Sequence, residues 1–111
     1  MFIDDRGAIL GSLQVAFSDQ DVAFAECHSV EDALQAIEKY QPEVIFLDHS
    51  LTEGGDEGLE IADQIEGIKI YSTTTNNRIT PEYQKRGIEN VDKSDLEKLG
   101  SIITGEQKIK K

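Results

Sequence analysis

Four consecutive apolar residues, 44–47, lead directly into Asp48. A short apolar run without polar alternation is typical of a strand that is buried on both faces, as in a parallel sheet. Asp48 would then lie at the carboxyl end of that strand, where open α/β sheets bind their ligands. Residues 2–3 lead into Asp4 and Asp5 in the same way. The pattern predicts three carboxylates at neighbouring strand ends, and because like charges repel, such a cluster favours a bound cation.

Apolar segments of strand length alternate along the chain with segments of helical periodicity. Strands are predicted over 1–4, 22–27, 44–47, 68–74 and 88–91, and helices over 6–18, 30–41, 59–65, 81–86 and 95–103. This alternation implies right-handed βαβ crossovers. We therefore expect an α/β fold, a doubly wound five-stranded parallel sheet with helices on both faces.

Three of the predicted helices follow residues that commonly cap helices. Ser29 precedes a segment whose apolar positions recur every three or four residues until Pro42. Thr80 is followed by a proline, which predicts a cap with proline at the first helical position. Ser94, with Glu97 three residues later, has the capping-box pattern.

Length and charge limit the classes of partner. At 111 residues the chain fits one domain, placed at 1–104, with a short basic tail at 105–111. The formal net charge of −11 repels nucleic acids and anionic membranes, so we expect neither as a partner. No apolar stretch of the sequence approaches the roughly 20 residues of a membrane-spanning helix. The single cysteine, Cys27, is expected to pack as a small apolar residue, and these features predict a cytoplasmic protein.

Polar residues that suit phosphoryl chemistry occur at the ends of four predicted strands. They are Asp4 and Asp5 at the first, Asp48 at the third, Ser72 at the fourth and Lys93 at the fifth. This set, in this order and on these elements, resembles the receiver domain of two-component response regulators. The resemblance covers nearly the whole chain. It implies a flavodoxin-like fold with strand order 2-1-3-4-5, and a stand-alone receiver that signals through protein contacts.

The resemblance also implies a role for each acid. Asp48 would accept the phosphoryl group, since a positioned carboxylate is a competent nucleophile for that transfer. Asp5 would bind Mg²⁺ directly and Asp4 through water, while Asp48 and the backbone carbonyl of Ser50 would complete the protein ligands. Oxygen ligands with several retained waters are what Mg²⁺ prefers.

The remaining implied roles concern the phosphoryl group and its source. Lys93 would pair with Asp48 and then with a phosphoryl oxygen. Ser72 would turn its hydroxyl toward the phosphoryl group, and Thr73 is the alternate if the strand register differs by one residue. The implied partners are a histidine kinase or phosphotransfer protein and a downstream protein target, with the receiver itself a monomer or weak homodimer.

Two residues depart from the receiver pattern. Asn90 stands three residues before Lys93, where the family commonly has an aromatic switch residue, and Ser94 replaces the usual proline after the lysine. These departures put the aromatic relay in doubt. They also leave open a second alternative function, a pseudo-receiver that binds partners without being phosphorylated.

His49 supports a different alternative. The run from Leu47 to His49 is similar to a receiver-like group thought to process cyclic phosphates, whose signature is Leu-Asp-His-Asp-Leu-Gly. A histidine beside a metal-bound phosphate can act as general acid or base. In this sequence Ser50 replaces the second acid of that signature. Because side chains alternate at a strand end, His49 is equally compatible with pointing away from Asp48.

Overall fold

A five-stranded, all-parallel sheet forms the centre of the protein, and a computed structural model describes it over residues 1–108. The strands are β1 (Phe2–Asp4), β2 (Phe24–Glu26), β3 (Val44–Leu47), β4 (Lys69–Ser72) and β5 (Glu89–Asn90). They are hydrogen-bonded in the order β2-β1-β3-β4-β5, with every pairing parallel. The predicted fold class and strand order are confirmed.

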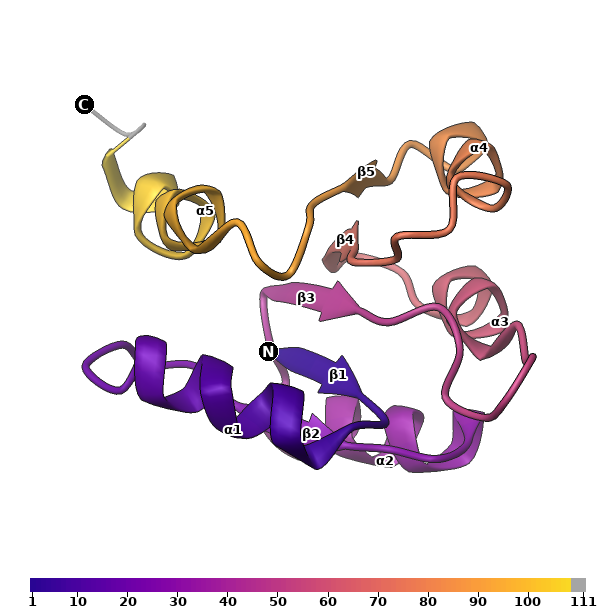
Figure 1. The fold of residues 1–111 in the computed structure, drawn as a ribbon, viewed down its shortest axis with the longest axis horizontal. Coiled ribbons are helices and arrows are strands. Elements are labelled where there is room, and N and C mark those ends of the chain that lie inside the picture. Colours follow the sequence, from indigo (N-terminus) through magenta and orange to yellow (C-terminus); the bar gives the residue numbers. More distant parts are fainter. Residues whose placement is uncertain (109–111) are drawn as a thin grey trace.

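Helices cover both faces of the sheet (Figure 1). They are α1 (Gly7–Ala16), α2 (Val30–Tyr40), α3 (Glu57–Gln64), α4 (Thr80–Lys85) and α5 (Leu96–Lys108). The first and last lie on one face, and α2, α3 and α4 lie on the other. Since α5 extends to Lys108, it includes the beginning of the segment predicted as a basic tail, and residues 109–111 of that tail lie outside the described residues.

Alternate residues of the strands face two separate apolar cores. The core under α2, α3 and α4 takes Ile3, Ile45, Leu47 and Ile70 from the strands. The core under α1 and α5 takes Phe2, Phe46 and Tyr71, whose rings stack with centroids 4.6 Å apart for the first pair and 5.5 Å for the second. Such burial on both faces is what the unbroken apolar run of the central strand predicts.

The register of β3 and β4 decides which polar residues share a face at the strand ends. Leu47 lies opposite Ser72, and the amide of Thr73 donates to the carbonyl of Leu47 at 3.0 Å. Asp48 and Thr73 therefore lie side by side, one residue beyond the paired ends. Because successive side chains alternate, these two share the face of α1 and α5, and Ser72 lies on the opposite face.

One of the three predicted caps is confirmed and two are wrong. The Ser29 hydroxyl accepts from the amide of Asp32 at 3.0 Å and caps α2. Thr80 lies inside α4, and its hydroxyl donates to a loop carbonyl, that of Asn77. Ser94 hydrogen-bonds the Asp92 side chain instead of capping α5. These two hydroxyls have acceptors nearby in their own loops, which compete with the capping geometry.

Cys27 is buried, as predicted, and its thiol is expected to be unreactive. Burial raises the pKa of the Cys27 thiol to about 11, and the charges of Asp32 and Glu26 add to the rise. Since the thiolate is the reactive species, alkylation at pH 8 is expected to be roughly 100-fold slower in the folded protein than in the unfolded chain. Iodoacetamide labelling followed by mass spectrometry, with and without denaturant, measures this difference. Equal rates in the folded and unfolded protein would show that the thiol is not buried and that its pKa is not raised.

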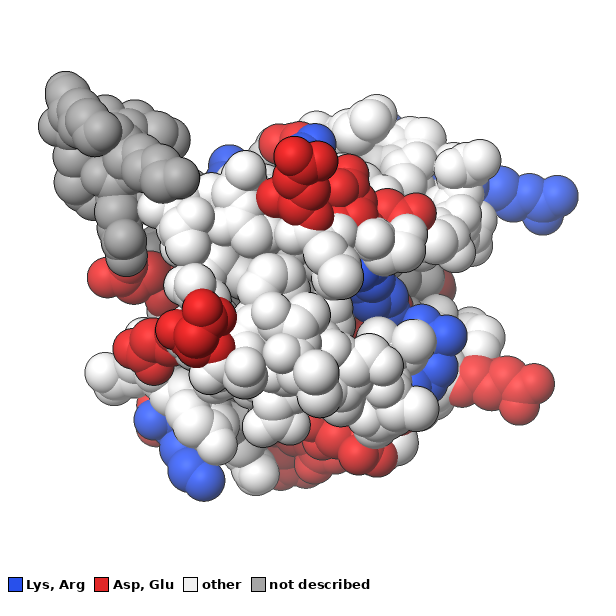
Figure 2. Space-filling view, turned by 60° about the vertical axis from the view of Figure 1, so that its left-hand side comes forward, with Lys and Arg blue, Asp and Glu red and all other residues white. Residues whose placement is uncertain are grey.

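The surface is strongly acidic. On the side that Figure 2 turns forward, acidic side chains form several patches and basic side chains are scattered between them. Within the described part of the chain, none of the helices combines the length and the apolar character needed to cross a membrane.

Candidate functional site

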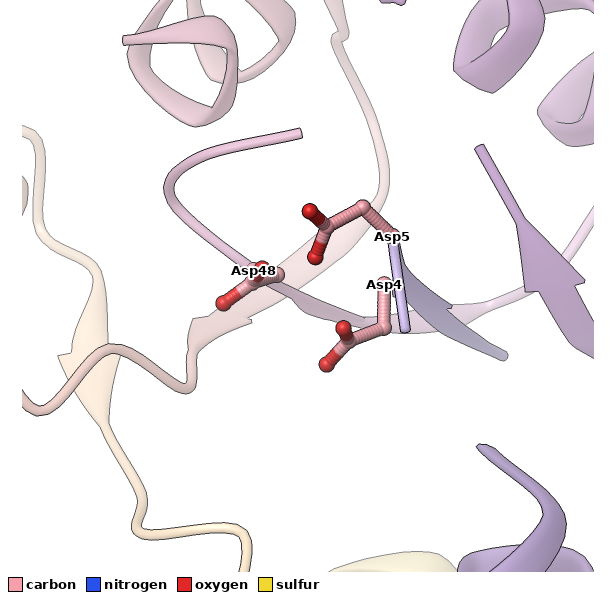
Figure 3. Close-up of side chains that lie close together, drawn as sticks. All are labelled: Asp4, Asp5 and Asp48. Carbon is pink, nitrogen blue, oxygen red and sulfur yellow. The ribbon is translucent and has the colours of Figure 1, made fainter. Parts of the chain in front are cut away.

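Three carboxylates converge at one edge of the sheet. Asp4 ends β1, Asp5 follows it, and Asp48 follows the neighbouring strand β3 (Figure 3). One oxygen from each of the three lies within 4.8 Å of the others. The predicted convergence is confirmed, and its cause is simple: the carboxyl ends of parallel neighbours meet at the same edge.

Lys93 reaches the cluster from the loop after β5. Its Nζ atom donates to Asp4 Oδ2 and to Asp48 Oδ1, the second at 3.2 Å, and its side chain is 14% exposed. The exposed Arg6 adds a weaker contact, with Nε 3.6 Å from Asp4 and 4.0 Å from Asp5. Two of the three carboxylates thus share the partly buried Lys93 ammonium, Asp5 lies near the exposed Arg6, and the site has an excess of negative charge.

This excess affects the protonation of Asp48. Burial, which penalises the charged form, raises the pKa of the Asp48 carboxyl above its ordinary value. The Lys93 ammonium opposes that rise, and the charges of Asp4 and Asp5 add to it. An additional cation beside these groups would favour the ionised form of Asp48, because it lowers the cost of the repulsion.

The three acids differ in how many of their oxygens are already used. Asp4 accepts from the Arg6 amide through Oδ1 at 3.0 Å and from Lys93 through Oδ2. Among residues 1–108, the Asp5 carboxylate has only the distant Arg6 guanidinium as an ion-pair partner. Asp48 accepts from Lys93 through Oδ1, and within residues 1–108 its Oδ2 makes no hydrogen bond. Asp5 and Asp48 are therefore the acids best able to bind a cation directly.

A pocket of about 320 Å³ opens over this cluster. Its lining consists of Asp5, Arg6, Asp48, His49, Ser50, Thr52, Glu53, Gly54, Thr73, Thr74, Thr75, Asn76 and Lys93. Thr73 is in this set and Ser72 is not, as the register of β3 and β4 requires. The structure thus brings the alternate hydroxyl beside Asp48, and Ser72 lies fully buried on the other face.

The ring of His49 points away from the acids. It is buried under α4, where Nδ1 lies 2.8 Å from the Tyr83 hydroxyl, and Nε2 lies 2.9 Å from Asp56 Oδ1. Both ring nitrogens are therefore engaged by protein groups. His49 follows Asp48 directly, and the alternation of side chains sends it to the opposite face of the sheet.

Sequence reasoning missed several contributors to the site. Arg6 was not assigned a role, although its place directly after the two acids was a usable signal. Thr74 lines the pocket as part of a run of hydroxyls that the sequence shows but cannot orient. Tyr83 contacts His49 across 34 positions of sequence, and no local pattern indicates that contact.

Comparison with known proteins shows the fold alone. No protein-family model and no curated protein matches the chain. A solved structure described as a yeast Spc42 trimeric coiled coil fused to another structure matches with a TM-score of 0.66 and 18% identity. The match covers 94% of this chain and 74% of that chain.

Proposed function

We propose that the protein is a single-domain receiver that accepts a phosphoryl group on Asp48 in a Mg²⁺-dependent reaction and signals through protein contacts. The observation that carries this proposal is the environment of Asp48. Its Oδ1 accepts from Lys93, its Oδ2 makes no hydrogen bond to any described residue, and Asp5 lies beside it at the edge of an open pocket. A positioned carboxylate flanked by a cation and a further acid suits phosphoryl transfer.

The chemistry needs little more than positioning. Oδ2 of Asp48 forms a bond to phosphorus, while the bond from phosphorus to the donor atom breaks and its electron pair leaves with the donor. Lys93, which already contacts Oδ1, is placed to neutralise charge on a phosphoryl oxygen. Thr73, beside Asp48 in the register, is the hydroxyl we assign to a second phosphoryl oxygen, in place of Ser72.

The donor set fits a hard divalent cation. Carboxylate oxygens of Asp5 and Asp48 and the backbone carbonyl of Ser50 would hold Mg²⁺, with Asp4 contacting it through water. When bound, the ion supplies neutralisation of charge on the transferred group. The excess of negative charge around one lysine supports this assignment.

The proposed partners follow from the chemistry of the site. A histidine kinase or phosphotransfer protein would present phosphohistidine to the open pocket, and the modified receiver would then bind a downstream protein. We place this exchange in the cytoplasm, where kinase and receiver meet.

Incubation with acetyl phosphate and Mg²⁺ tests the proposal. Intact-mass measurement under mild conditions is expected to show one added phosphoryl group on the wild type and none on Asp48→Asn. Asp19→Asn, the same change at an exposed acid outside the site, is the matched control and should label like the wild type. Absence of labelling on the wild type would contradict the proposal.

The same protein samples test the two alternative functions, a cyclic-phosphate phosphoesterase and a pseudo-receiver. Turnover of a nucleotide 2′,3′-cyclic phosphate would favour the phosphoesterase, although the geometry does not, because both ring nitrogens of His49 are engaged. A protein that neither labels nor turns over such a substrate would be a pseudo-receiver.

A further inference from the structure

A buried hydrogen bond joins α4 to the residue that follows Asp48. The Tyr83 side chain is fully buried, its hydroxyl lies 2.8 Å from His49 Nδ1, and the two rings meet edge to face with centroids 5.7 Å apart. Tyr83 lies at the middle of α4, a helix of only six residues. Because so short a helix has little stability of its own, contacts of this kind fix its position.

The chemistry of the partners sets the direction of this bond. The carboxylate of Asp56 only accepts, so the His49 Nε2 atom beside it carries the hydrogen. In neutral imidazole the other nitrogen is then an acceptor, and the Tyr83 hydroxyl donates to it. Burial raises the pKa of the Tyr83 hydroxyl, and the Asp48 charge adds to the rise, so the donor keeps its proton.

The contact is tight, and it includes the backbone of the phosphoacceptor. An ideal Cβ atom on Gly58, in the first turn of α3, would lie 2.2 Å from the Tyr83 hydroxyl and 2.8 Å from the Asp48 carbonyl oxygen. The Gly58 amide donates to the His49 carbonyl at 2.7 Å. The end of β3, the start of α3 and the middle of α4 therefore meet without free space, so a displacement of one is transmitted to the others.

A second contact joins α3 and α4 at the surface. The Arg86 guanidinium, directly after α4, donates from Nε and Nη2 to the two carboxylate oxygens of Asp63 in α3, at 2.7 and 3.1 Å. Fewer contacts of this kind pass through β5. Asn90 stands where the receiver pattern has an aromatic residue, and its buried side-chain oxygen has no hydrogen-bond partner in the part of the chain that the structure describes.

We propose that Tyr83 is a positioning residue that couples α4 to the state of Asp48 through its hydrogen bond to His49. This inference rests on the proposed function, since it names how phosphorylation of that site is transmitted. Modification of Asp48 shifts the adjacent His49 backbone, His49 shifts the Tyr83 hydroxyl, and α4 moves as the readout element. Reciprocity relates the two binding affinities. If a phosphoryl mimic at the acid site changes the affinity of α4 for a partner protein by some factor, that partner changes the affinity of the acid site for the mimic by the same factor.

Nuclear magnetic resonance with beryllofluoride and Mg²⁺, a mimic of the phosphoryl group, tests the coupling. In the wild type, amide shifts are expected at the acid site and across Thr80–Lys85. In Tyr83→Phe, which removes only the hydroxyl, the acid-site shifts should persist and the α4 shifts should fall at least about twofold. Tyr40→Phe, the same substitution at a half-exposed position of α2, should respond like the wild type.

A second measurement needs no variant. The ¹⁵N shift of His49 Nδ1 reports its hydrogen bond directly and is expected to change when beryllofluoride is added to the wild type. Undiminished α4 shifts in Tyr83→Phe, or an unchanged Nδ1 signal while α4 responds, would overturn the coupling and leave the proposed function standing. No shift at the acid site of the wild type would overturn the proposed function, and the coupling with it.

Discussion

Replacing Gly58 with alanine is expected to lower the free energy of unfolding by about 3 kcal/mol, the upper range for inserting a group into a filled core. The added Cβ would lie 2.2 Å from the Tyr83 hydroxyl and 2.8 Å from both the Asp48 carbonyl oxygen and His49 Cα. Two of these three atoms belong to backbone at the end of β3, which cannot move without disturbing the site. Urea denaturation followed by circular dichroism measures the loss.

Gly11→Ala is the matched control for this substitution. Gly11 lies inside α1, and an added Cβ would have no atom within 4 Å from the described residues beyond its own stretch of helix backbone. Alanine is the better helix former, so this variant is expected to gain about 0.5–1 kcal/mol. A Gly58→Ala protein as stable as wild type would mean that α3 and α4 are not held against the end of β3 as described.

The fold could be predicted because short stretches of the sequence indicate each of its strands and helices. Each short apolar run indicates a buried strand, and each amphipathic segment between two runs indicates a crossover helix. Parallel strands with such crossovers place their carboxyl ends at one edge, so Asp4, Asp5, Asp48 and Lys93 could be expected together before any distance was known. The structure confirms that arrangement at distances that permit a shared cation.

Two further properties are not encoded locally in the sequence. One is the register between neighbouring strands, and the other is which nearby acceptor binds a hydroxyl that could also cap a helix. A shift of one residue exchanges Ser72 for Thr73 on the face of Asp48, and the apolar run of β4 fits both registers. Thr80 and Ser94 are good capping residues by type, yet nearby acceptors take their hydroxyls. Sequence proximity leaves both orientations of His49 open, and it is a distant tyrosine that holds the ring on the face opposite Asp48.

Asp5→Asn is expected to weaken Mg²⁺ binding at least about 100-fold. Two opposite unit charges 4 Å apart near a protein surface attract each other by about 4 kcal/mol. The hydration that the free ion loses on binding offsets part of this attraction. Within the described part of the chain, Asp5 makes only a distant ion pair with Arg6, so its carboxylate is the most available of the three acids for a direct bond to the ion. Titration followed by amide shifts near Asp5 and Asp48 gives the dissociation constants.

Glu53→Gln provides the matched control, because it removes the same charge from an exposed position in the lining of the same pocket. Solvent screens a charge at such a position, so its effect on Mg²⁺ affinity should stay within about threefold. Equal losses in the two variants would mean that the pocket attracts the ion by its overall charge and that Asp5 is not a ligand.

The stability of Asp5→Asn relative to the wild type should have opposite signs with and without the metal. Without Mg²⁺, three carboxylates repel one another around Lys93, so Asp5→Asn is expected to be more stable than the wild type by about 1 kcal/mol. With saturating Mg²⁺ the order should reverse, because binding stabilises only the protein that retains the site. Thermal melts with and without the ion would show the crossing. If the difference in melting temperature between the two proteins is the same with and without Mg²⁺, the ion does not bind through Asp5 and the cation site must lie elsewhere.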